Sequence, residues 1–197
     1  MATSPRLHEL EDIEQRIWSE LELAVGAPRA EGESHDWRTV VLATVDGQVP
    51  DARTLVLREV DARERQLVFY TDARSPKVRQ IEQSPVGALM CWSRSLDWQL
   101  RMQVRLNVQT SGLAVSSRWA RLQSTQRAMD YLAHHPPGHK LPGPAAAPQA
   151  LPTPDLGSRS WFAMITALVE EIDWLELHPD GHRRAMFAHG TAHWVQP

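Results

Sequence analysis

The chain has 197 residues, 42% of them hydrophobic and 23% charged, and a formal net charge of −3 at pH 7. These values are typical of a soluble globular protein, and we expect a single domain over residues 1–197. The small negative charge argues against a general nucleic-acid or membrane surface. The only cysteine, Cys91, excludes an intrachain disulfide and a four-cysteine metal site, and its apolar neighbours predict a core residue.

Apolar residues at spacings of three and four predict an amphipathic N-terminal helix over residues 5–25, which Gly26 and Pro28 end. The segment before this helix has no apolar core of the kind found in signal peptides, and no apolar run approaches membrane length. We therefore expect a protein of the reducing cytoplasm. Residues 37–45 predict a strand, and Asp46-Gly47 is a hairpin signal that leads into the next one.

The stretch from Arg53 to Lys77 contains two short apolar runs around a charged turn. Residues 54–57 and 67–70 predict the strands of a hairpin, and residues 61–65 predict its turn. A helix then begins, because Ser75 suits an N-cap and Pro76 suits the first helical position.

This helix start favours a binding site for phosphate. A helix N-terminus offers free backbone N–H groups and a partial positive charge. Four side chains in the stretch can add a hydroxyl and full positive charges to it, namely Arg53, Arg58, Ser75 and Lys77. The alternative is a solvated hairpin with surface arginines.

Further strands are predicted at residues 86–92, 98–110, 161–169, 174–177, 182–188 and 193–195. The run 86–92 is almost continuously apolar and predicts a buried strand, whereas residues 98–110 alternate between apolar and polar. The segment 170–173 is predicted to be a turn. These strands, with short turns and no βαβ rhythm, predict a mainly β protein with flanking helices (α+β), built on an antiparallel barrel.

Ser116 or Ser117 can cap a helix that runs to about residue 134. Its predicted buried residues are Trp119, Leu122, Met129 and Leu132. The segment 136–154 holds seven of the fourteen prolines and predicts a long Pro-rich loop. Three histidines stand at its start, His134, His135 and His139. No carboxylate or cysteine joins them at ligand spacing, so a solvated loop is expected, and a metal site is the alternative.

Several of these segments resemble the flavin mononucleotide (FMN) site of the pyridoxamine 5'-phosphate oxidase-like flavoproteins. They are the strand R-T-L-V-L-R at residues 53–58, the strand end F-Y-T at 69–71, the helix start S-P-K at 75–77 and M-Q-V-R at 102–105. Trp174 and Arg184 also have the ten-residue spacing of a tryptophan and an arginine in that family. The family carries an arginine at the positions of Pro76 and Met102, and a lysine at that of Arg58.

The resemblance covers about residues 37–195 and implies an FMN-binding split β-barrel. It also implies a homodimer in which residues of both chains surround each FMN at the subunit interface. The residues that it implies for FMN binding are Arg53, Thr54, Leu55, Val56, Arg58, Tyr70, Thr71, Ser75, Lys77, Gln103, Trp174 and Arg184. The alternative for three of them is a purely structural role. Gln103 would then lie on the solvent-exposed face of a strand, Trp174 in the core and Arg184 on the surface.

The substrate motifs of the true oxidases, R-P-x-x-S and R-x-H, are not intact. Arg121 to Thr125 keeps an arginine and a hydroxyl without the Arg-Pro pair, and Asp180-Gly181-His182 has an acid where the family has arginine. We therefore expect an FMN-dependent oxidoreductase of unknown small-molecule substrate, with no catalytic residue assigned. The alternatives are a non-catalytic flavin-binding protein for storage or sensing, and a split barrel that binds haem or a deazaflavin.

Overall fold

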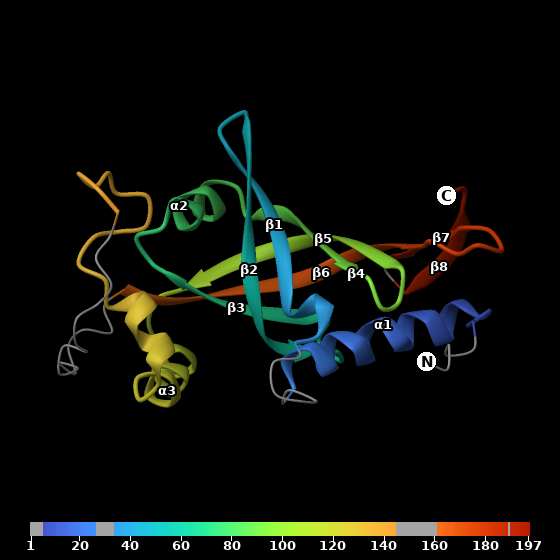
Figure 1. Ribbon diagram of the computed structural model, residues 1–197, viewed down its shortest axis with the longest axis horizontal. Coiled ribbons are helices and arrows are strands. Elements are labelled where there is room, and N and C mark those ends of the chain that lie inside the picture. Colours follow the sequence, from blue (N-terminus) through green and yellow to red (C-terminus); the bar gives the residue numbers. More distant parts are fainter. Residues whose placement is uncertain (1–5, 27–33, 145–160, 189) are drawn as a thin grey trace.

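The structure is a computed structural model that describes residues 6–26, 34–144, 161–188 and 190–197 (Figure 1). Its helices are α1 (Leu10–Val25), α2 (Pro76–Gln83) and α3 (Leu113–Leu122), with 3-10 turns η1 (Asp36–Arg38) and η2 (Gln126–Tyr131). Its strands are β1 (Thr39–Asp46), β2 (Val49–Asp61), β3 (Gln66–Asp72), β4 (Val86–Ser93), β5 (Trp98–Gln109), β6 (Phe162–Glu176), β7 (Arg183–Ala188) and β8 (Thr191–Val195).

The strands form a closed antiparallel barrel with an extension. They follow the order β3-β2-β1-β4-β5-β6-β7-β8, and β3 also pairs with β6, so β1 to β6 form a ring. Strand β6 makes both parts possible because its first half pairs with β3 and its second half pairs with β7. The predicted antiparallel barrel is therefore confirmed, and β7 and β8 continue the sheet beyond it (Figure 1).

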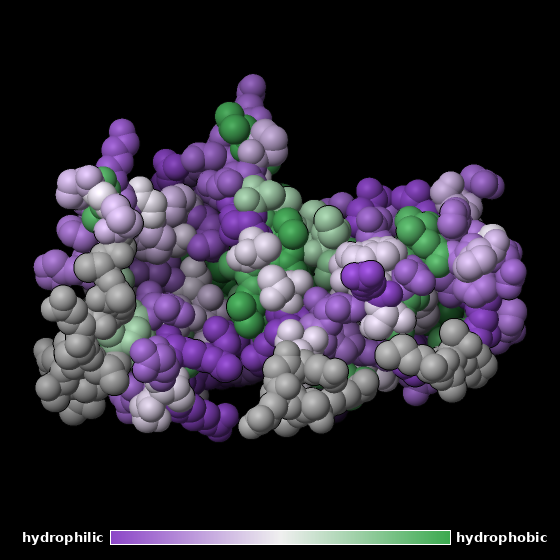
Figure 2. Space-filling model, in the orientation of Figure 1, coloured by the Kyte–Doolittle hydropathy of each residue, from purple (hydrophilic) through white to green (hydrophobic). Residues whose placement is uncertain are grey.

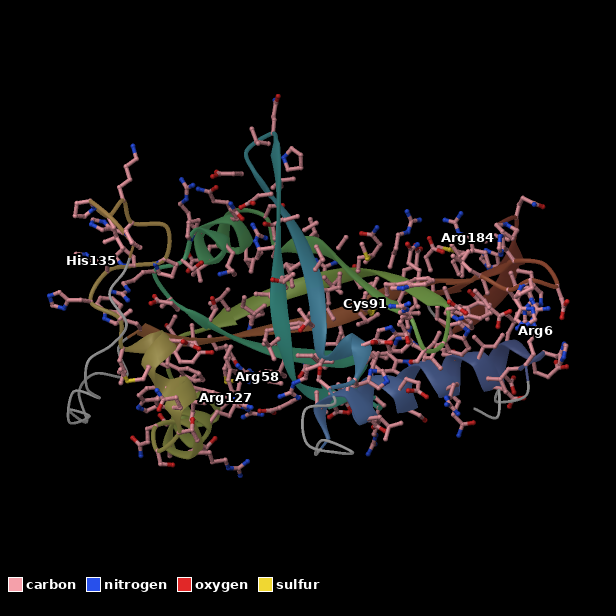
Figure 3. All side chains as sticks on the ribbon, viewed as in Figure 1. Arg6, Arg58, Cys91, Arg127, His135 and Arg184 are labelled. Carbon is pink, nitrogen blue, oxygen red and sulfur yellow. The ribbon has the colours of Figure 1, made fainter. Side chains whose placement is uncertain are left out.

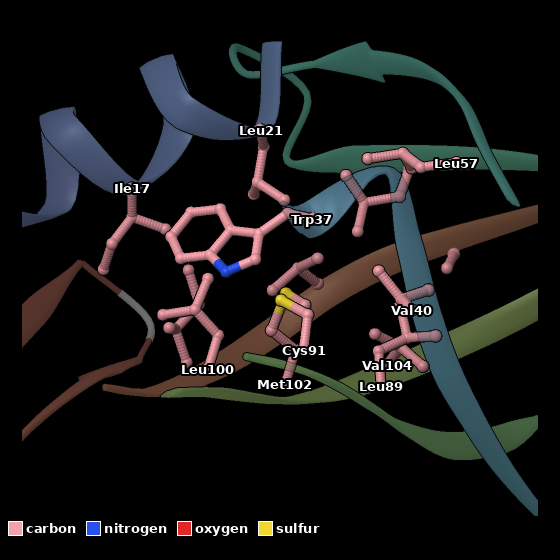
Figure 4. Close-up of a cluster of buried hydrophobic side chains, with 14 of the residues drawn as sticks. Ile17, Leu21, Trp37, Val40, Leu57, Leu89, Cys91, Leu100, Met102 and Val104 are labelled. Atoms are coloured by element: carbon pink, nitrogen blue, oxygen red, sulfur yellow. The ribbon is translucent and has the colours of Figure 1, made fainter. Parts of the chain in front are cut away.

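The main core fills the barrel and continues under α1. Figure 4 shows Trp37 at its centre, packed against Ile17 and Leu21 of α1 and above Cys91 and Leu100 of the sheet. Trp37 is fully buried and Cys91 is 3% exposed, so the expectation that Cys91 is a core residue is confirmed. Burial raises the pKa of the Cys91 thiol well above its usual range, which makes it unsuitable as a nucleophile.

A second, smaller core lies where α3 and η2 cover β3 and β6. It consists of Val68, Val115, Trp119, Leu122, Ala128, Tyr131, Phe162 and Met164. Trp119 and Tyr131 both pack on the ring of Phe162, with centroids 5.5 and 5.3 Å away. Buried Trp119 and Leu122 agree with the predicted stripe, but Ala128 and Tyr131 are buried in place of Met129 and Leu132, because the chain continues as a 3-10 turn.

Four predictions are wrong: the bounds of two helices, the burial of one strand and the position of one turn. The N-terminal helix begins at Leu10, and α3 begins after Gly112 and ends at Leu122, without a cap from Ser116 or Ser117. Strand β4 is buried on one face only, because successive side chains of a strand point to opposite faces of the sheet and only one face of β4 covers the core. Residues 170–173 do not turn. They continue β6, which accommodates an extra residue by a register shift opposite Gln103 and Val104.

The hairpin predictions are confirmed. Gly47 adopts φ +64° in the turn between β1 and β2, a conformation that glycine enters without steric cost. The segment after Asp61 turns the chain from β2 into β3. The Pro-rich loop is described only up to residue 144, so most of that prediction lies outside the described residues. None of the helices in the described ranges is long and apolar enough to cross a membrane.

A candidate phosphate cradle and the residues around it

The start of α2 gathers four of the predicted site residues. Lys77 reaches back over the helix start, and its Nζ donates to Ser75 Oγ at 2.5 Å and to Thr71 Oγ1 at 3.3 Å. Ser75 and Thr71 are buried, and Arg53 lies near enough to act electrostatically on Lys77. We call Arg53, Thr71, Ser75 and Lys77 the phosphate cradle.

The positive charge of Lys77 is poorly compensated. Burial lowers the pKa of Lys77, and the neighbouring Arg53 guanidinium lowers it further, while Asp72 and Asp51 act in the opposite direction. Among the described residues no carboxylate forms an ion pair with Lys77, whose hydrogen bonds go only to hydroxyls. A bound dianion would relieve this imbalance, because an opposite charge at close range favours the charged lysine.

The N-terminus of α2 also favours an anion. Ser75 takes the N-cap position and Pro76 the first helical position, as predicted, and the Ser75 side chain makes no capping hydrogen bond to the helix. The hydroxyl is engaged by Lys77 instead. In the first turn Pro76 has no N–H and the Val78 N–H donates to the Ser75 carbonyl at 2.9 Å, so the Lys77 N–H, with the helix dipole behind it, is the group that can serve an anion.

Arg53 is held in place by a polar network on β1, β2 and α2. Its guanidinium donates to Thr44 Oγ1 at 2.6 Å, to Gln80 Oε1 at 2.8 Å and to Asp51 Oδ2 at 2.5 Å. Gln80 is buried, and it also donates from Nε2 to Asp51 at 2.9 Å. The pKa of Asp51 is lowered first by the hydrogen bond from Gln80 and then by that from Arg53. This network fixes the direction of Arg53 before any ligand arrives.

The sequence reasoning missed Thr44, Asp51 and Gln80. One signal for Gln80 existed, since it follows Lys77 by three residues and so lies on the same face of α2. A buried amide on that face needs polar partners, and these come from distant strands.

Strand β2 presents an open edge next to the cradle. Residues 49–56 pair with β1, but pairing with β3 begins only at Leu57. The backbone groups of Thr54, Leu55 and Val56 that face away from β1 therefore have no strand partner among the described residues. Thr54 and Val56 are exposed, whereas the Leu55 side chain is buried. This edge can hydrogen-bond a flat heterocycle with donors and acceptors on its rim.

Arg58 and Tyr70 do not join the cradle. Arg58 lies on the face of β2 opposite to the buried Leu55 and Leu57. It lines a different pocket, together with Tyr70 and residues of α3 and η2. Burial, followed by Glu59, raises the pKa of Tyr70 to about 12, and its hydroxyl donates to Glu59 at 2.9 Å.

Gln103 is exposed on the outer face of β5, as the predicted alternation requires. It pairs across the sheet with Ala88, which pairs with Ala43, which pairs with Ala52 of β2. Three strand spacings thus separate Gln103 from β2, or about 14 Å at the usual distance between strands. Gln103 is thus in register with Ala52 and not with a residue of the cradle.

Trp174 and Arg184 lie on opposite faces of the sheet. Trp174 is fully buried and packs edge-on against Trp98 at 5.2 Å. Arg184 points outward, where its guanidinium donates to Asp173 at 2.8 and 2.7 Å, and Arg101 binds the same carboxylate. Burial opposes the ionisation of Asp173, but the hydrogen bonds from Arg184 and Arg101 outweigh it and lower its pKa. Figure 3 shows Arg184 near the end of the molecule, away from Arg58.

The described chain thus brings together Arg53, Thr71, Ser75 and Lys77 beside the open edge of Thr54 to Val56. It does not bring Arg58, Tyr70, Gln103, Trp174 or Arg184 to that place. Their assignment to FMN stays a prediction.

Comparisons with known proteins match the part of the chain that contains the cradle. The family model described as "Pyridoxamine 5'-phosphate oxidase, FMN-binding domain" matches residues 17–110, which include the whole cradle. The pyridoxine/pyridoxamine 5'-phosphate oxidase of Chromohalobacter salexigens is 35% identical over 81 residues, which are 41% of this chain and 37% of the relative. That of Gloeothece citriformis is 40% identical over 65 residues, 33% of this chain and 29% of the relative. These matches therefore span well under half of the curated relatives.

Two solved structures share the fold over most of the chain. A pyridoxamine 5'-phosphate oxidase-related, FMN-binding protein from Nostoc punctiforme superposes with a TM-score of 0.63 at 22% identity, covering 81% of this chain and 87% of the other. PhzG from Burkholderia lata, solved with tetrahydrophenazine-1-carboxylic acid, gives a TM-score of 0.67 at 16% identity, covering 96% and 93%. Residues 17–110 therefore carry an FMN-binding domain of the pyridoxamine 5'-phosphate oxidase type, and most of the chain shares the fold of these two solved structures.

Proposed function

We propose that this protein binds FMN at the cradle and acts as an FMN-dependent oxidoreductase. The observation that carries the proposal is the poorly compensated, half-buried Lys77 beside Arg53 at an open helix N-terminus. A terminal phosphate fits these donors, because charge-assisted hydrogen bonds from Arg and Lys are stronger than neutral ones.

The residues of this chain would divide the work as follows. Arg53, Lys77, Ser75 and the first turn of α2 bind the phosphate, while Thr71 supports Lys77. The open edge at residues 54–56 orients the ring through backbone groups. FMN, when bound, supplies hydride or electron transfer, and the protein supplies position, charge and exclusion of water.

Absorbance and mass spectrometry of the purified full-length chain test the cofactor. Flavin bands and a released mass of FMN are the expected result. The cradle suits a terminal phosphate, and no dinucleotide-binding G-x-G-x-x-G motif is present in the sequence. A Soret band, or FAD or a deazaflavin as the main released species, would contradict the proposal. Flavin without turnover of reduced nicotinamide or of any substrate would leave a flavin-binding storage or sensing protein.

We expect only weak oxidation of pyridoxamine 5'-phosphate. Asp180 takes the place of the family's substrate arginine and is exposed in the turn before β7. A carboxylate there repels a phosphate, and a substrate anion without its partners is costly to bind. The measurement is hydrogen peroxide release from the FMN-loaded protein, with the Asp180→Arg variant alongside. Rapid release by the unmodified chain would contradict this expectation.

We further propose a homodimer with FMN at the subunit interface. Gln103 lies on the outer face of the sheet, in register with Ala52 of β2 and about 14 Å from it along the sheet. A second copy packed on this outer face can bring the flavin of its own cradle to Gln103. Three large apolar side chains of β4 on that sheet are at least 40% exposed, namely Val86, Met90 and Trp92. Figure 2 shows apolar surface in the middle of the molecule, beside the projecting β1–β2 hairpin. Exposed apolar surface of this kind suits a two-fold interface.

Sedimentation velocity at micromolar concentration tests the dimer. The unmodified chain is expected to sediment as a dimer, and Met90→Glu/Trp92→Glu as a monomer with weakened FMN binding, because charges would be buried in an apolar contact. Leu113→Glu is the control, since Leu113 is 86% exposed at the start of α3. A monomeric unmodified chain that binds FMN tightly would contradict both the dimer and the shared site.

A further inference from the structure

The turn between β3 and α2 contains an arginine, Arg74, that is held by a buried carboxylate. Its guanidinium donates from Nε to Asp72 Oδ1 at 3.0 Å and from Nη2 to Asp72 Oδ2 at 2.7 Å. The Arg74 backbone N–H also donates to Asp72 Oδ1 at 2.8 Å. The Asp72 side chain is only 4% exposed. Charge-assisted hydrogen bonds to a buried carboxylate are strong, so Asp72 fixes the direction of the Arg74 side chain.

The same guanidinium binds two segments that are distant in sequence. After η2 it donates from Nη2 to the Ala133 carbonyl at 2.8 Å and from Nη1 to the His134 carbonyl at 3.2 Å. It also lies over the ring of Trp161, just before β6, at 4.2 Å. Figure 1 shows the segment after η2 beside the turn between β3 and α2. We call Asp72, Arg74, Trp161 and these two carbonyl groups the Arg74 network.

The Arg74 network lies within the backbone that forms the phosphate cradle. Thr71 directly precedes Asp72, and Ser75 directly follows Arg74. The Ser75 N–H donates to the Asp72 carbonyl at 3.0 Å, and the Ala73 N–H donates to the Trp161 carbonyl at 2.7 Å. The backbone of residues 72–75 is therefore held from both sides. Its conformation sets the positions of the two cradle hydroxyls that flank it.

The arginine itself does not face the cradle. Four N–H groups of Arg74 are engaged, one from Nε, one from Nη1 and two from Nη2. An arginine can serve a carboxylate, two carbonyl groups and an aromatic ring at once because its guanidinium is planar and carries five donors. Arg74 can therefore act on a ligand of the cradle only through the turn that it holds.

We propose that Arg74 is a positioning residue of the phosphate cradle, and that FMN binding and the docking of residues 133–134 stabilise each other through it. The identity of the ligand as FMN rests on the proposed function. A ligand that orders the turn also orders the carbonyl groups that Arg74 binds, and the docked segment orders the turn in return. Such coupling between two sites is reciprocal, so each event should favour the other by the same factor.

The double variant Asp72→Asn/Arg74→Gln tests the positioning role. It removes both charged partners, so it leaves no buried charge unpaired and keeps the net charge of the chain. Its FMN affinity, measured by flavin fluorescence, is expected to fall about tenfold. Asp46→Asn/Arg79→Gln is the matched control, because it removes an exposed ion pair between β1 and α2, and it should change the affinity less than twofold. Equal FMN affinity of the Asp72/Arg74 variant and the unmodified chain would overturn the proposal.

Arg74→Lys separates position from charge. Lysine keeps the positive charge but lacks the planar fork that binds Asp72 and the carbonyl groups together. Its FMN affinity should also fall, with circular dichroism of the native fold unchanged. Full FMN affinity in Arg74→Lys would mean that charge alone is sufficient, and would overturn the positioning role.

Proteolysis measures the coupling to the docked segment. The chain has two lysines: Lys77, half-buried in α2, and Lys140, exposed after the docked segment. An endoproteinase that cleaves only after lysine therefore reports on this segment at Lys140. Saturating FMN is expected to slow the cleavage about tenfold in the unmodified chain, and to leave it unchanged in the Asp72/Arg74 variant. An unchanged cleavage rate in an unmodified chain that binds FMN would overturn the coupling.

The same samples distinguish this proposal from the proposed function. Without FMN, the Asp72/Arg74 variant should already be cleaved faster at Lys140 than the unmodified chain. Faster cleavage of the variant, with no FMN binding by either chain, would refute the proposed function and support the Arg74 network. Equal FMN affinities and equal cleavage rates would refute the Arg74 network and support the proposed function.

Discussion

The Arg53→Ala variant is expected to bind FMN about 10- to 150-fold more weakly than the unmodified chain, a loss of about 1.5–3 kcal/mol. Arg53 stands beside Lys77, and its guanidinium is fixed by Thr44, Gln80 and Asp51. Removing it takes a charged donor away from a partly buried phosphate. The measurement is a titration followed by flavin fluorescence.

Two further variants sharpen this test. Arg79→Ala is the matched control, because Arg79 lies on α2, the helix that begins in the cradle, but is exposed and pairs with Asp46. Arg58→Ala separates the structure from the family resemblance, which groups Arg58 with Arg53. Since Arg58 lies on the other face of β2, its loss should weaken FMN less than that of Arg53. Equal FMN affinity of Arg53→Ala and the unmodified chain would make Arg53 a structural residue only.

The Trp174→Ala variant is expected to lose about 3–5 kcal/mol of unfolding free energy, the usual cost of removing a buried tryptophan. Trp174 is fully buried and contacts both Trp98 and Trp194. Urea denaturation followed by circular dichroism measures this loss. Trp194→Ala is the control, because Trp194 is 45% exposed, and it should cost about 1 kcal/mol.

The conservative variant Trp174→Phe decides whether this residue also serves the flavin. It keeps an aromatic ring in the core, and its FMN affinity should stay within twofold of that of the unmodified chain, because no part of Trp174 reaches the surface. A folded Trp174→Phe protein with much weaker FMN binding would show that the family role of this tryptophan is kept here.

Local chemistry was sufficient to predict the start of the cradle. Ser75 and Pro76 begin α2 as expected, and the hairpin before it turns after Asp61, because caps and turns depend on a few neighbouring residues. The alternation in β5 likewise predicted correctly which residues face the core and which, like Gln103, face outward. The family resemblance, carried by such short motifs, predicted the barrel and FMN.

Features that depend on pairing or packing were decided only by the tertiary structure. Strand β6 runs through residues 170–173 because β5 pairs with it on both sides of its register shift. Because Arg53 and Arg58 are close in sequence, we predicted that they share one site. The alternation of β2 instead turns Arg58 to the outer face, where it faces α3 and η2. The segments α3 and η2 reach Arg58 because Trp119 and Tyr131 pack on Phe162. Phe162 is distant from β2 in sequence, so no local pattern links the two. Local residues determine caps, turns and faces, but contacts between distant segments determine which charges share a pocket.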